Sequence, residues 1–145
     1  MTYNQIVKEI RTVLENNAFL HSVKFATPTE WINWEGVPEL PIGLYAINQG
    51  TFDMGYQNSY NVEVWLLDKS GVEGEFETEV ISDMHQVAND IVNAISLSSA
   101  PYAVQKPITW TAISDKFEDY ISGITFVLTI QTNGEFSYCD FPTTT

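Results

Sequence analysis

The sequence is poor in basic residues and in cysteine, and each shortage excludes a class of protein. It has 6 Lys+Arg against 19 Asp+Glu, which gives a net charge of -13. Proteins that bind nucleic acid neutralise phosphates with clustered Lys and Arg, so a free nucleic-acid binder is largely excluded. The negative charge also argues against docking on an anionic membrane. The single cysteine, Cys139, excludes an internal disulfide and a cysteine-based metal cluster.

Long hydrophobic runs are also missing. No apolar stretch approaches the roughly 20 residues that a membrane span requires. The N-terminus is polar and leads straight into an amphipathic pattern, so we expect no signal peptide and a soluble protein of a reducing compartment. The chain is nevertheless 44% hydrophobic over 145 residues, which is enough for one domain with a core of its own.

The spacing of hydrophobic residues predicts two amphipathic helices. The first covers residues 2–17 and begins with Thr2 and Gln5 at the spacing of a capping box. The second covers residues 79–97 and has a wide apolar face. Glutamates at or before its first turn suit the positive end of the helix dipole.

Four strands are predicted, over residues 42–48, 58–68, 106–114 and 120–132. The second has the clearest alternation of apolar and polar residues. Residues 49–57 contain two glycines and predict an antiparallel hairpin with a long tip. Gly123, inside the last strand, predicts a bulge or a close approach of two backbones.

The order helix, strand, strand, helix, strand, strand predicts an α+β fold. We expect a mostly antiparallel sheet of about four strands with both helices packed on one face. Residues 1–132 would form this single domain and residues 133–145 a C-terminal arm. The hairpin tip and the arm are long for a small domain, and such appendages often contact neighbours in an assembly.

The search for catalytic chemistry finds little. Nothing places the two histidines, His21 and His85, together. Ser82 and Asp83 lie within one helical turn of His85, but a glycine-flanked nucleophile and an oxyanion donor are missing. The alternating glutamates of residues 73–79 lack the spacing of an EF-hand and predict a solvated acidic loop. We expect no catalytic residue, cofactor or metal. An enzyme or a ligand-binding module remains an alternative class of function, behind the two that are described below.

The order and spacing of the elements resemble the small tail-terminator, tail-completion and head–tail joining proteins of tailed bacteriophages. The resemblance spans most of the chain, from the opening helix with its Asn-rich end to the strand pair and the middle helix. It rests above all on the last predicted strand and the segment before it, where residues 117–124 (FEDYISGI) lead into residues 125–132. The segment with Trp31 and Trp34 and the aromatic tail after Asn133 depart from the family's minimal pattern.

The resemblance implies a structural protein without enzymatic activity. Members form rings, commonly hexameric, at the head-proximal end of the tail tube, where they stop tube polymerisation and join the tail to the neck while DNA passes through the lumen. The expected partners are copies of itself (a hexamer favoured, a dodecamer possible) and tail-tube, neck or portal proteins, with no membrane. The expected location is the virion, after assembly in the cytoplasm of a host bacterium.

The residues make this interpretation physically coherent. A conduit should not bind DNA tightly, and an acidic wall repels phosphates. A head-to-tail ring uses two different patches on each subunit, and aromatic residues outside the core pattern are common interface anchors, although they could also cap core edges. We expect contacts between subunits or with partners through Trp31, Trp34, Phe52, Met54, Tyr56, Phe136, Tyr138 and Phe141. The candidates for an acidic lumen are Glu63, Asp68, Glu73, Glu75 and Glu77.

The alternative is a small acidic inhibitor that mimics DNA. A net charge of -13 suits a decoy for a nuclease or a restriction enzyme. Such mimics need carboxylates at phosphate-like spacing over a long face. Several acids here fall in short turns, which favours the ring.

Overall fold

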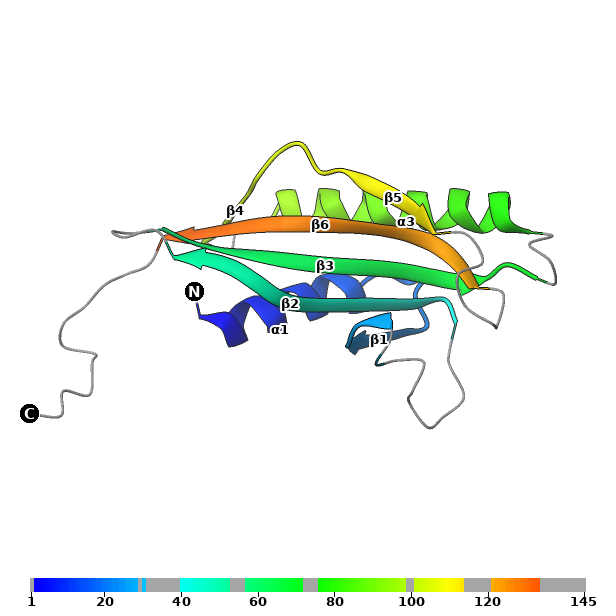
Figure 1. Ribbon diagram of the computed structural model, residues 1–145, viewed down its shortest axis with the longest axis horizontal. Coiled ribbons are helices and arrows are strands. Elements are labelled where there is room, and N and C mark those ends of the chain that lie inside the picture. Colours follow the sequence, from blue (N-terminus) through cyan, green and yellow to red (C-terminus); the bar gives the residue numbers. More distant parts are fainter. Residues whose placement is uncertain are drawn as a thin grey trace, which may run out of the picture.

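The computed structural model describes residues 2–28, 30, 40–52, 57–71, 76–98, 101–113 and 121–133. This part of the chain is an α+β fold in which helices cover an elongated sheet (Figure 1). The elements in chain order are α1 (Tyr3–Glu15), β1 (Ser22–Phe25), β2 (Ile42–Phe52), β3 (Gln57–Lys69), α3 (Glu77–Ser96), β4 (Ala103–Val104), β5 (Trp110–Ile113) and β6 (Ile121–Asn133).

The described sheet has six strands and is mixed, with one parallel pair, whereas the sequence predicted a mostly antiparallel sheet of about four strands. Its order is β1-β2-β3-β6, and both β4 and β5 pair with the outer edge of β6. β1 runs parallel to β2, and the other pairs are antiparallel. The long strands β2, β3 and β6 (11, 13 and 13 residues) lie inside the sheet, and strands of two to four residues form both rims.

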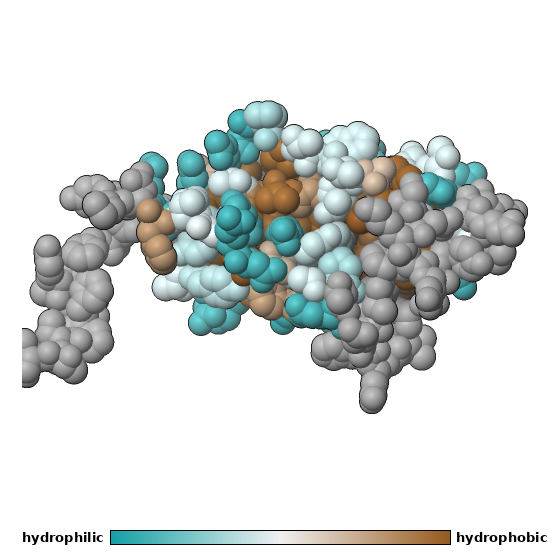
Figure 2. Space-filling model, viewed as in Figure 1, coloured by the Kyte–Doolittle hydropathy of each residue, from teal (hydrophilic) through white to brown (hydrophobic). Residues whose placement is uncertain are grey.

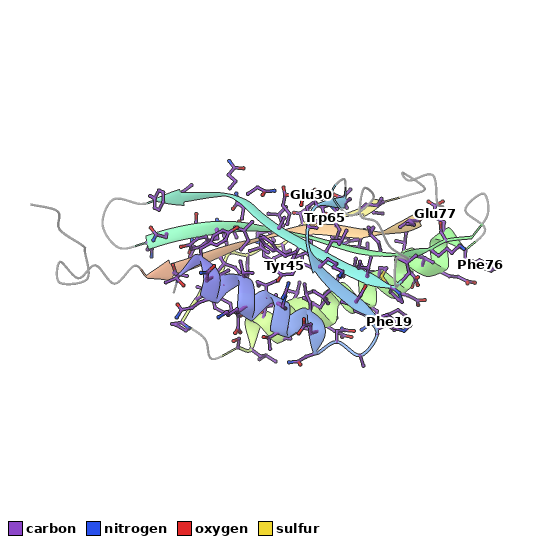
Figure 3. All side chains as sticks on the ribbon, turned by 90° about the horizontal axis from the view of Figure 1, so that it is seen from below. Phe19, Glu30, Tyr45, Trp65, Phe76 and Glu77 are labelled. Carbon is purple, nitrogen blue, oxygen red and sulfur yellow. The ribbon has the colours of Figure 1, made fainter. Side chains whose placement is uncertain are left out.

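The main core lies between the sheet and both helices. Alternate residues of β3 and β6 point into it, which is the pattern expected of a sheet with one covered face. The buried residues of α1 are Ile6, Ile10 and Leu14, and those of α3 are Val80, Met84, Val87, Ala88, Ile91 and Ile95. Because these side chains form one cluster with the strands, both helices lie against the same face, as Figure 3 shows.

A buried tyrosine fixes α1 on the sheet. Tyr45 of β2 is fully buried, and Figure 3 places it between the sheet and α1. Its hydroxyl accepts a hydrogen bond from Arg11 Nε (3.1 Å) and donates one to the carbonyl of Val7 (3.4 Å). Burial raises the pKa of the Tyr45 phenol, so it stays a neutral donor near neutral pH.

A second apolar cluster lies on the other face, at the end of the sheet where β2 and β6 begin. It contains Ile42, Leu44, Leu67, Ile113 and Ile121, with Trp65 partly buried against it. Both faces of β2 are therefore apolar here, which explains why its first residues form a continuous hydrophobic run.

The N-terminus of α1 has the predicted capping box. Thr2 Oγ1 accepts from the Gln5 backbone N–H (3.3 Å), and Gln5 Oε1 accepts from the Thr2 backbone N–H (2.8 Å). The helix ends at Glu15, two residues before the predicted end. In the same way α3 begins at Glu77, two residues earlier than predicted.

Replacing Thr2 by alanine should therefore lower the free energy of unfolding by about 1 kcal/mol, because one capping bond is lost. Urea unfolding followed by circular dichroism would measure it. Thr2→Ser keeps the hydroxyl and serves as the control. If serine destabilised the fold as much as alanine, the cap would not be the cause.

The β2–β3 hairpin corrects the prediction of a long tip. Pairing continues past a register shift between Ile47 and Gln49 and ends with Phe52 opposite Asn58. Only residues 53–56 separate the two strands, and these lie outside the described residues. The absence of a side chain at Gly50 permits the close approach, since a Cβ there would collide with the carbonyl oxygen of Ser59. Polar strand ends carry no alternation of hydrophobicity, so sequence spacing missed them.

The two C-terminal strands also differ from prediction. The expected strand over residues 106–114 shortens to Trp110–Ile113. Pro107 has no N–H to donate to a ladder, and Ile108 packs against the main core from outside the strand. β6 matches the predicted last strand to within one residue at each end. The close backbone approach predicted at Gly123 is confirmed, because a Cβ there would collide with the carbonyl oxygen of Leu66.

Candidate functional site

The structure describes part of the predicted contact and lumen sets. Phe52 is the contact candidate that it describes; Trp31, Trp34, Met54, Tyr56, Phe136, Tyr138 and Phe141 lie outside the described residues. Of the acidic candidates, Glu63, Asp68 and Glu77 are described, and Glu73 and Glu75 are not. The predicted arm begins at Asn133, which is the last residue of β6.

Phe52 lies at the exposed end of the β2–β3 hairpin. The last five residues of β2 are exposed, and Phe52 is 91% exposed. β3 begins here with Gln57 paired to Asn133, so β6 ends beside the hairpin (Figure 1). The two segments predicted to contact neighbours, the hairpin end and the chain after β6, therefore start at the same end of the sheet.

A groove of about 240 Å³ lies along the hairpin end on the α1 side. We call it the hairpin groove, and its lining is Tyr3, Ile47, Asn48, Gln49, Gly50, Thr51, Phe52, Asn58, Ser59 and Tyr60. Register pairs Phe52 with Asn58 and Gly50 with Tyr60, so these residues share one face of the hairpin.

The first turn of α1 supplies one end of the hairpin groove. The Tyr3 hydroxyl donates to the carbonyl of Ile47 (3.0 Å). The Tyr3 ring lies 6.4 Å from the ring of Tyr60, centroid to centroid, at an interplanar angle of 57°. These contacts hold two aromatic rings in fixed positions, with Phe52 farther out along the same groove.

The described residues that line the hairpin groove are electrically neutral. None of its ten lining residues is Asp, Glu, Lys or Arg. Most of the surface of a chain with net charge -13 repels another copy of that chain. The described lining residues of the groove therefore add no like-charge repulsion to the approach of a second acidic chain.

The face of the sheet away from the helices, here called the open face, has a different character. A depression of about 350 Å³ on it is lined by Asn48, Gln49, Asn61, Glu63 and Val127. Val127 is 45% exposed and lies opposite Glu63 in register. Figure 2 views the molecule with the sheet in front of the helices, and it shows hydrophobic side chains near the centre with hydrophilic ones around them.

The three described acidic candidates do not share one surface. Glu63 lies on the open face. Asp68, five residues farther along β3, points to the helix side, where His21 and Asp83 are its electrostatic neighbours. Glu77 lies in the first turn of α3. A single acidic wall on one subunit therefore cannot contain all three.

Burial raises the pKa of the Asp68 carboxyl. The hydrogen bond that it accepts from the Lys69 backbone N–H (2.8 Å) and the charge of His21 oppose this shift, and Asp83 adds to it. The folded chain therefore holds the Asp68 proton more tightly than the unfolded chain does.

Replacing Asp68 by asparagine should accordingly stabilise the protein at neutral pH and leave it unchanged in acid. Between the ordinary pKa of 3.8 and the raised value, the folded state binds more protons than the unfolded state, so the free energy of unfolding falls as pH rises. Urea unfolding midpoints, taken from below pH 3.8 to neutral pH, would measure the difference in stability between Asp68→Asn and the unmodified chain. A difference that did not change with pH would contradict this cause.

Sequence reasoning did not identify several aromatic residues that the structure leaves at the surface or in the groove. Tyr3 is 42% exposed and Tyr60 is half-buried against the main core, and both line the hairpin groove. Trp110 of β5 is 50% exposed and contacts the ring of His85 edge to face at 5.0 Å. Their positions at or near the ends of elements were the one available signal, because periodicity alone does not show where cover by a helix stops.

The described residues contain no group of three or more His, Cys, Asp or Glu side chains placed to hold a metal ion. None of the helices in that part of the chain combines the length and apolar character needed to cross a bilayer.

Comparison with known proteins adds no assignment. No family model matches the sequence, and no curated protein matches it.

Proposed function

We propose that this chain is a structural subunit of a ring at the head–tail interface of a tailed bacteriophage. The ring caps the tail tube or joins it to the head, and DNA passes through it. One observation carries the proposal: Phe52 is 91% exposed at the end of the β2–β3 hairpin and lines a groove whose described residues are uncharged. Burying such a side chain at an interface stabilises the contact between the two subunits by about 1.5–3 kcal/mol.

The proposed ring requires head-to-tail contacts, in which one patch of each subunit meets a different patch of the next. The hairpin end and the segment that follows Asn133 are the two candidate patches. Head-to-tail contacts close into a ring when the rotation from one subunit to the next is a full turn divided by a whole number. The expected state is a hexamer, with a dodecamer as the other possibility.

The charge of the chain supports a DNA conduit. A net charge of -13 weakens every contact with phosphate, which lets DNA slide past. Glu63 on the open face is the described acid that we assign to the lumen. The separate positions of Glu63, Asp68 and Glu77 do not make the continuous array that a DNA mimic needs.

The proposal assigns no reaction to the chain. Its partners are copies of itself together with tail-tube, neck or portal proteins, and its place is the virion. Neighbouring genes for a portal, a capsid and tail proteins would support this assignment independently of any measurement on the protein.

Sedimentation velocity and electron microscopy of the full chain, alone and mixed with tail tubes, would test the proposal. We expect closed rings in solution or rings at one end of a tube. A chain that stays monomeric at high concentration and binds neither tubes nor portals would overturn it. Turnover of a substrate at a cluster of titratable groups would do so as well.

A further inference from the structure

We propose that the hairpin groove of one subunit binds residues 134–145 of a neighbouring subunit. The inference rests on the proposed ring, and it names the segment and the surface that form each contact.

The first argument is the place where the segment starts. β6 runs toward the hairpin end and finishes at Asn133, opposite Gln57. The twelve residues that follow extend over as much as about 40 Å, which is enough to reach an adjacent subunit. The segment is therefore attached at the end of the sheet that carries the hairpin groove.

The second argument is chemical fit. The sequence of residues 134–145 is GEFSYCDFPTTT. An extended backbone places Phe136 and Tyr138 on one side, and the groove offers the rings of Tyr3, Tyr60 and Phe52. Stacked or edge-on pairs of aromatic rings at a contact contribute beyond their buried area.

The third argument is charge. The segment carries two acids, Glu135 and Asp140, in a chain that is already strongly negative. The described residues that line the hairpin groove include no acid, and the side-chain amides of Asn48, Gln49 and Asn58 are donors for carboxylates and backbone carbonyls. None of these lining residues therefore carries a charge that opposes the approach.

The direction of β6 favours a second copy over the chain's own groove. Phe136 is only three residues past Asn133, and β6 runs toward the hairpin end until it finishes opposite Gln57. To enter its own groove the chain would have to reverse at once and run back along the hairpin. A neighbour's groove needs no reversal, and it gives each subunit one donor surface and one acceptor surface.

Disulfide trapping in the full chain tests the contact between the segment and the groove, and it uses the cysteine that the segment already contains. Cys139 is the single cysteine and lies between Tyr138 and Phe141. Asn58→Cys adds a thiol in the groove, opposite Phe52. Mild oxidation should give a ladder of linked chains on a non-reducing gel, because every subunit then carries a thiol on each of its two contact surfaces.

A matched control and a mixing experiment identify the pair that reacts. Thr111→Cys adds an exposed thiol on β5, outside the groove, and should leave only the dimers that Cys139 can form alone. Asn58→Cys combined with Cys139→Ser should link to the unmodified chain as a one-to-one pair. A single fast-migrating band of internally linked Asn58→Cys chain would overturn the proposal, and so would a yield no higher than that of Thr111→Cys.

A second variant separates this inference from the ring itself. Replacing Phe136, Tyr138 and Phe141 together by serine should weaken self-association at least about tenfold. Rings that persist in this variant would overturn the docking and leave the proposed function standing. A ladder from Asn58→Cys in a chain that never forms rings, alone or on tubes, would support the docking and overturn the proposed function.

Discussion

Replacing Gly123 by alanine should lower the free energy of unfolding by about 3 kcal/mol or more. A Cβ at this position would collide with the carbonyl oxygen of Leu66 and lie 3.1 Å from the Cα of Leu67. Both atoms belong to the backbone of β3, so the collision is relieved only by moving β3 and β6 apart. This pair is the longest in the sheet, and urea unfolding would measure the loss.

Gly43→Ala is the matched control on β2. Its Cβ would meet the Cδ1 atom of Leu20 at 3.0 Å, which is the end of a flexible side chain that can shift. We expect the free energy of unfolding of Gly43→Ala to change by no more than about 1 kcal/mol. Equal losses at the two glycines would show that backbone contact is not what makes Gly123 necessary.

Replacing Phe52 by serine should abolish ring formation and leave the stability of the monomer unchanged. The side chain is 91% exposed, so the fold loses almost no packing. Each contact between subunits should lose about 2 kcal/mol, and the loss recurs at every contact in a closed ring. Sedimentation velocity and electron microscopy would measure assembly, with thermal unfolding to measure the fold.

Leu97→Ser provides the comparison for Phe52. Leu97 is 85% exposed at the C-terminal end of α3 and does not line the hairpin groove. Removing a large exposed apolar side chain there should not change assembly. Rings that survive in Phe52→Ser, or are lost equally in Leu97→Ser, would contradict the role given to the hairpin end.

Local periodicity predicted the elements that carry their own signal. α1, α3 and β3 each have a clear spacing of apolar residues, and the Thr2 cap marked the start of α1 correctly. β1 has four residues of mixed polarity and is held by pairing with β2 about 20 residues later, which no local pattern encodes. β4, with two residues, has no period to detect.

The candidate site was predictable only in part. Phe52 stood out because it lies outside the core pattern, and the structure places it at an exposed hairpin end. The hairpin groove arises because β2 and β3 continue past the start of α1, which depends on tertiary packing. The separation of Glu63 from Asp68 was available from the sequence, because residues an odd number apart on one strand point to opposite faces.

The short strands at the rims of the sheet also limit how copies can join. β1 has four residues, and the opposite rim is divided between β4 and β5. Long unprotected edges act as templates for adding further strands, whereas brief and interrupted edges give an incoming strand few backbone partners. The rims described here therefore leave crowded copies of the chain little backbone through which to pair into amyloid-like fibrils.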